Sequence, residues 1–68
     1  MSIFSEANQA RLALKMKLSQ YGWYKSSSVE STEDGFGVII NVTHIDNNIR
    51  KIIPPVFGGV YVKTEADT

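Results

Sequence analysis

Hydrophobic residues in the first third of the chain recur at helical spacing. At about 100° per residue, one narrow stripe is formed by Ala7, Ala10, Leu14, Leu18 and Tyr21. Ile3 leads into this stripe, Ser5 is placed to cap a helix, and Gly22 is placed to stop it. The pattern predicts a helix over roughly residues 5–20 whose stripe faces the core.

Two apolar residues, Leu12 and Met16, lie one helical turn apart on nearly the opposite side of this helix. They are either tolerated surface residues or a second contact face for a partner or another copy. Leu12, Leu14, Met16 and Leu18 also alternate as in a strand, but the long run of good helix formers favours the helix.

The middle of the chain changes to an alternating pattern. Phe36, Val38, Ile40 and Val42 point one way in a strand over residues 36–43, and Gly37, Ile39, Asn41 and Thr43 point the other. Residues 23–30 predict a weaker strand, whose serines favour an edge position. The turn signal Glu33-Asp34-Gly35 joins the two strands into a hairpin.

A short helix is predicted over residues 45–52, where Ile45, Ile49 and Ile52 recur at helical spacing. Thr43 or Asp46 is placed to cap it, and Pro54 and Pro55 end it. Gly58-Gly59 then forms a flexible link to a last strand over residues 60–64. Residues 65–68 are expected to be a frayed polar tail.

The predicted order is α-β-β-α-β in a single domain over residues 1–68. The long connection between the second and third strands favours a helical crossover and a parallel pair. We therefore expect a two-layer α+β fold: a three-stranded mixed sheet, its second strand central, with both helices on one face. This order and the Gly59-Val60 step resemble the small BON modules, known for phospholipid or periplasmic association, but fold alone transfers no function.

Composition narrows the classes of function. The 68 residues include 7 basic and 7 acidic side chains, so the net charge is +0, which disfavours a nucleic-acid binder and permits self-association. The absence of cysteine excludes disulfides, cysteine-ligated zinc and thiol nucleophiles. No secretion signal or membrane span is evident, so a cytoplasmic location is expected.

Residues that could carry out chemistry are few. His44 is the only histidine, and we interpret it as a polar surface residue rather than a base or pH sensor. The acidic cluster Glu30, Glu33 and Asp34 lacks a calcium-loop pattern and is interpreted as a solvated turn. We expect no metal, no cofactor and no enzymatic activity.

A two-layer domain leaves one face of its sheet uncovered. Ile39 and Tyr61 are predicted on that face, with Trp23 or Tyr24 from the edge strand. Such aromatic residues among polar ones are typical of a protein interface. The leading hypothesis is a small non-enzymatic interaction or regulatory module, of a kind suited to a bacterial or phage accessory protein, that binds a partner or itself. It would use this face, an edge strand, or the Leu12 and Met16 side of the first helix.

Two alternatives remain open. Basic side chains in the first third, beside Trp23 and Tyr24, could bind nucleic acid: Arg11, Lys15, Lys17 and Lys25. The chain could also be an accessory subunit of a larger enzyme, in which His44 or the acidic hairpin completes a site.

Overall fold

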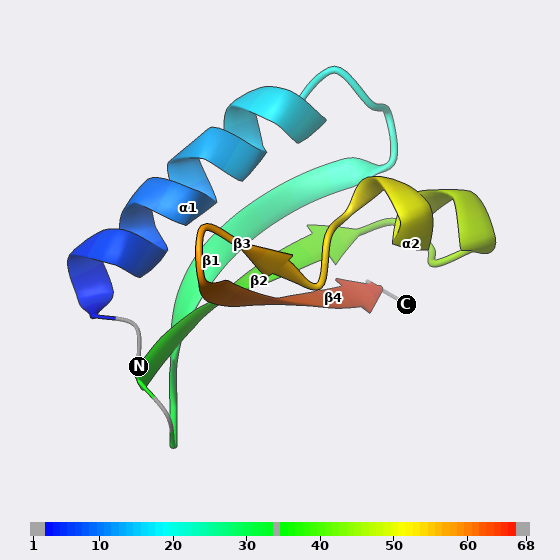
Figure 1. Cartoon of the computed structure of the whole chain (residues 1–68). Helices are drawn as coiled ribbons and strands as arrows, with labels where there is room; N and C mark the ends of the chain where they lie inside the picture. Colours follow the sequence, from blue (N-terminus) through cyan, green and yellow to red (C-terminus); the bar gives the residue numbers. More distant parts are fainter. Residues whose placement is uncertain (1–2, 34, 67–68) are drawn as a thin grey trace.

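The computed structural model describes residues 3–33 and 35–66 and shows an α+β fold with a mixed four-stranded sheet (Figure 1). The elements in chain order are α1 (Phe4–Leu18), β1 (Tyr24–Thr32), β2 (Gly35–Val42), α2 (Asn47–Ile52), β3 (Val56–Phe57) and β4 (Val60–Ala66). The strands lie side by side in the order β1-β2-β4-β3. The α+β class is therefore as predicted, but the sheet has one strand more than expected.

The central strand β2 organises the sheet. It pairs antiparallel with β1, as the predicted hairpin requires, and parallel with β4 in the register Val38↔Val62 to Val42↔Ala66. Val38, Ile40 and Val42 are buried, whereas Ile39 between them is only half-buried. The predicted alternation, the central position of this strand and its parallel pairing are all confirmed.

Helix α1 covers β1 and β2 with the predicted stripe: Ala7, Ala10, Leu14 and Leu18 are all buried. Its ends differ from the prediction. Ile3, not Ser5, occupies the N-cap and makes no side-chain capping bond, and the helix stops at Leu18, before Gly22. Ile3 is exposed rather than part of the core, and Tyr21 is half-buried beyond the helix end.

Both helices lie on the same side of the sheet, as Figure 1 shows. Ile49 of α2 belongs to the same core cluster as α1 and the inward residues of β2. The Asp46 side chain accepts a hydrogen bond of 2.8 Å from the Ile49 N–H and caps α2, as predicted. The helix ends at Ile52, and Ile53 before Pro54 is extended, which confirms the predicted stop.

The extra strand β3 forms a tight hairpin with β4, in which Val56 pairs with Tyr61 and Phe57 with Val60. Gly58 and Gly59 have φ of 58° and 80°, and a two-residue turn with positive φ at both positions is a favoured hairpin connection. The predicted flexible link is therefore a defined turn. Strand β4 also includes Glu65 and Ala66, so the prediction of a frayed tail from residue 65 is wrong for these two residues. Residues 67 and 68 of the predicted tail and Asp34 of the predicted first turn lie outside the described residues.

Two leucines two positions apart on α1 provide a direct test of this packing. Leu14 is fully buried, so Leu14→Ala should cost about 2–5 kcal/mol. That is most of the roughly 3–7 kcal/mol expected for a domain of this size. Leu12→Ala is the matched control, because Leu12 is 43% exposed and its loss should cost about 1 kcal/mol or less. Urea unfolding followed by circular dichroism measures both; equal losses would contradict the orientation of α1.

Candidate functional site

The sheet face away from the helices, here called the open face, combines a small apolar area with a polar flank. Its apolar part consists of Tyr61, which is 66% exposed, its cross-strand partner Val56, which is 47% exposed, and half-buried Ile39. Lys63 and Glu65 follow Tyr61 on the same face of β4 and form an ion pair of 3.2 Å. The predicted placement of Ile39 and Tyr61 on the uncovered face is thus what the structure shows.

A shallow groove of about 250 Å³ runs across the open face beside Tyr61. Its floor is Gly37, where a Cβ atom would lie 3.2 Å from the main-chain oxygen of Tyr61. Glu30, Thr32 and Lys63 form its polar sides. The missing side chain at Gly37 therefore leaves Tyr61 standing beside a depression, a shape that a protruding side chain of a partner can fill.

Trp23 and Tyr24 do not lie on the open face, which corrects the prediction. A β-bulge falls between Tyr24 and Ser26, so Tyr24 pairs with the buried Val42 while Ser26 pairs with Asn41. The extra residue turns Tyr24 toward the helices, where its hydroxyl donates to Ser27 Oγ at 3.0 Å. Trp23 stacks on Tyr21 with ring centroids 4.8 Å apart, and both rings pack against the core.

Leu12 and Met16 form a separate apolar pair on the outer side of α1. Met16 is 80% exposed, and both residues point away from the sheet that α1 covers. The domain therefore carries apolar groups on two opposite sides, the open face and the back of α1. The two sets do not form one surface.

The basic residues of the first third are divided rather than gathered. Lys15 and Lys17 are two positions apart on α1, which separates them by about 200° around the helix axis. Arg11 donates two hydrogen bonds to Asn8 Oδ1, at 3.1 and 3.0 Å. Lys25 lies at the bulge of β1 and is exposed. Arg11 and Lys15 are one helical turn apart and share one side of α1, so only Lys17 and Lys25 are separated from them.

His44 is exposed and lies at the start of α2. Its Nδ1 is 3.0 Å from Thr43 Oγ1, and its Nε2 is 3.3 Å from Asp46 Oδ2. Asp46 therefore contacts both His44 and the Ile49 N–H, and the latter bond, aided by His44, lowers the pKa of the Asp46 carboxyl. This arrangement stabilises a helix start.

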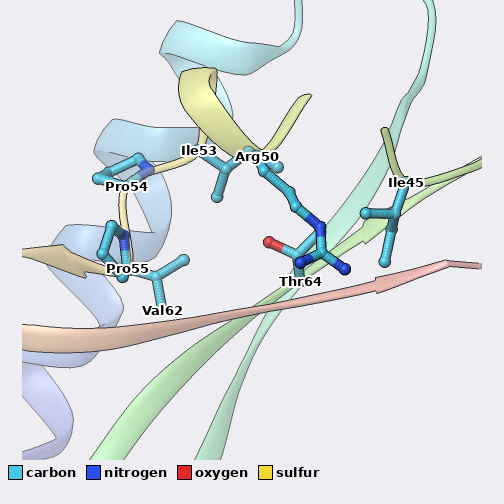
Figure 2. Close-up of a pocket in the computed structure, with 7 residues that line it drawn as sticks. All are labelled: Ile45, Arg50, Ile53, Pro54, Pro55, Val62 and Thr64. Carbon is cyan, nitrogen blue, oxygen red and sulfur yellow. The ribbon is translucent and has the colours of Figure 1, made fainter. Parts of the chain in front are cut away.

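The structure also shows a groove that the sequence did not indicate, here called the α2–β4 groove. It has a volume of about 360 Å³ and lies on the helix side of β4 (Figure 2). It is lined by Ile45, Arg50, Ile53, Pro54, Pro55, Val62 and Thr64. Figure 2 shows the Arg50 side chain reaching across it toward Thr64, with the two prolines and Val62 at the other end. No sequence motif marks it, because it arises where the segment after α2 comes alongside β4.

Among residues 3–33 and 35–66, no three histidine or carboxylate side chains are close enough together to hold a metal ion. Within the same residues, no polar or charged side chain is buried. Neither described helix has the length and apolar character that crossing a bilayer demands. No protein-family model matches the chain, and no curated protein or solved structure is significantly similar to it.

The Asp46 cap leads to a pH-dependent prediction. Since the folded-state pKa is lowered, ionised Asp46 stabilises the fold above its ordinary pKa of 3.8, and this contribution is lost as the pH falls through the folded-state value. Asp46→Asn keeps a capping oxygen but cannot ionise. Wild type should therefore unfold at higher urea than Asp46→Asn at pH 7, and the difference should shrink as the pH falls below 3.8 and disappear below the lowered pKa of folded Asp46.

His44→Ala is the control for this experiment, because it removes the neighbouring ring and leaves the Ile49 bond in place. In the His44→Ala background, Asp46→Asn should still change the urea midpoint at pH 7 by most of the amount seen with His44 present. A difference between wild type and Asp46→Asn that is constant with pH would contradict the proposed cause.

Proposed function

We propose that this chain is a non-enzymatic interaction module whose open face binds a partner protein or a second copy of the chain. The observation that carries the proposal is the exposed Val56–Tyr61 pair beside the Gly37 groove. Both residues lie on paired strands, so binding would order few additional groups and lose little conformational entropy. Exposed aromatic residues in such settings are typical of interface hot spots.

The surroundings of the pair support the same proposal. Lys63 and Glu65 neutralise each other on the open face, and Asn41 donates a 3.3 Å hydrogen bond to Ser26 Oγ. A polar rim of this kind around a small apolar centre is the usual anatomy of an interface. The net charge of +0 adds no general repulsion between two copies.

The open face is favoured over the Leu12–Met16 pair on geometric grounds. Tyr61 stands next to a depression and has an apolar cross-strand neighbour, whereas Leu12 and Met16 are two side chains on a convex helix surface. For a nucleic acid, Arg11 and Lys15 share one side of α1 but Lys17 lies about 200° from Lys15, so the basic residues do not form one continuous surface.

We expect Tyr61→Ser to remove partner binding while the domain stays folded. Tyr61 is mostly exposed, so its replacement should cost about 1 kcal/mol or less of folding free energy. Two measurements apply: light scattering against concentration for self-association, and affinity capture with wild-type and variant baits. Met16→Ser is the matched control, since it removes another exposed apolar side chain, on the opposite side of the domain.

The proposal fails if wild type is strictly monomeric and captures no specific partner. It also fails if Met16→Ser, rather than Tyr61→Ser, abolishes binding. Oligonucleotide binding with a steep salt dependence that disappears when Lys15 and Lys17 are neutralised would instead support the nucleic-acid alternative.

A further inference from the structure

The second half of β4 has a free edge. Strand β3 pairs with β4 only at Val60 and Tyr61, and the last main-chain bond on that side runs from the Val62 N–H to the Pro55 oxygen, at 2.9 Å. Prolines have no N–H, so Pro54 and Pro55 cannot donate to β4 and extend this ladder. Within residues 3–33 and 35–66, no strand pairs with β4 beyond Val62 on the side away from β2.

The direction of the main-chain groups follows from the Val62 bond. Peptide groups alternate in direction along a strand, so Thr64 and Ala66 present their N–H groups to the same free edge as Val62. No main-chain partner for them occurs on that side within residues 3–33 and 35–66. An extended segment placed there could form about three main-chain hydrogen bonds.

The side chains next to this edge define what such a segment must carry. Val62 and Thr64 point to the helix side and line the α2–β4 groove together with Ile53, Pro54 and Pro55. Alternate side chains of an added strand would enter the groove. Near the prolines and Val62 the groove is apolar, and next to Thr64 it lies under Arg50 (Figure 2).

Arg50 lacks an acidic partner in the described part of the chain. Asp46, the acidic residue nearest to it in sequence, contacts His44 and the Ile49 N–H. Lys51 adds a second positive charge to the last turn of α2. A carboxylate placed beside Thr64 would therefore find an unpaired guanidinium with several free donors.

We propose that the α2–β4 groove binds an extended segment of a partner protein, added as a strand beside Thr64 and Ala66. The segment carries an apolar residue and, two positions away, an acidic residue. The apolar side chain packs against Val62 and the two prolines, and the acidic one pairs with Arg50. This site lies on the opposite side of β4 from Tyr61 and does not depend on the open face.

The test uses the blocked peptide acetyl-TVTLTDT-amide, whose even-numbered positions place leucine and aspartate on one face. It should bind wild type saturably in a titration followed by amide chemical shifts of the protein. Amide chemical shifts should change at Thr64, Ala66 and Arg50 rather than along β1. Arg50→Glu should weaken binding roughly tenfold or more, and acetyl-TVTLTKT-amide should bind this variant better than it binds wild type.

Lys51→Glu is the matched control, because it makes the same charge change on the neighbouring residue, which does not line the groove. It should change the affinity by less than about twofold. Thr64→Pro removes one N–H from the free edge of β4 and should abolish binding. If this variant does not fold, the comparison of the aspartate and lysine peptides on wild type and Arg50→Glu still tests the proposal. Tyr61→Ser should bind the peptide as wild type does, which separates this site from the open face.

Absence of saturable binding by wild type would overturn the proposal. Equal affinity of wild type for the aspartate and lysine peptides would also overturn it, as would chemical shift changes confined to β1. Concentration-dependent dimerisation that perturbs Thr64 and Arg50 without peptide would show that a second copy occupies the groove, and would also overturn it.

Discussion

The structure depends on the burial of one face of β2 against two helices. Val38, Ile40 and Val42 meet Leu14 and Leu18 of α1, and Ile49 of α2 joins the same cluster. A chain of 68 residues has enough large apolar side chains for one such layer and not for a second. The other face of the sheet therefore remains in contact with solvent, and the polar side chains of β1 and β4 make it compatible with water. The exposed position of Tyr61 and Val56 is a consequence of this single-layer core, and it explains why the proposed interaction surfaces lie on the sheet.

Elements whose pattern extends over several turns or residues could be predicted from the sequence. The stripe of α1 includes four buried residues and the alternation of β2 includes three, and Pro54 ends α2 for steric reasons that do not depend on the fold. The ends of α1 were less well predicted. At its start, Ile3 occupies the N-cap but makes no side-chain capping bond, and at its end Ser19 occupies the C-cap, three residues before Gly22. A glycine near the end of a helical pattern therefore does not fix the residue at which the helix ends; here the bond from the Ser19 N–H to the Lys15 oxygen marks that end.

The missed features are each decided by one or two residues. Strand β3 has only two residues, too few for any periodicity, and exists because Gly58 and Gly59 take the positive φ values of a tight hairpin. The bulge before Ser26 has no compositional signal, yet it reverses the face on which Tyr24 lies. The α2–β4 groove could be predicted only by knowing that the chain after α2 comes alongside β4, where the Val62 N–H bonds to the Pro55 oxygen. Candidate residues on the regular part of the sheet, Ile39 and Tyr61, were placed correctly, whereas those next to the irregularity were not.

The two edges of the sheet differ in the features that discourage pairing with another strand, and this difference makes β4 the edge at which we propose binding. Strand β1 is rich in serine and carries a bulge, two features that discourage addition of another strand. Strand β3 protects only the first part of β4, since the prolines before it supply no N–H to extend the ladder. The remaining part of β4 then presents Tyr61 and Lys63 to the open face and Val62 and Thr64 to the groove. Because these side chains alternate along one strand, two partners could occupy the two surfaces without competing for a side chain, and any coupling between them would have to pass through the backbone of β4 itself.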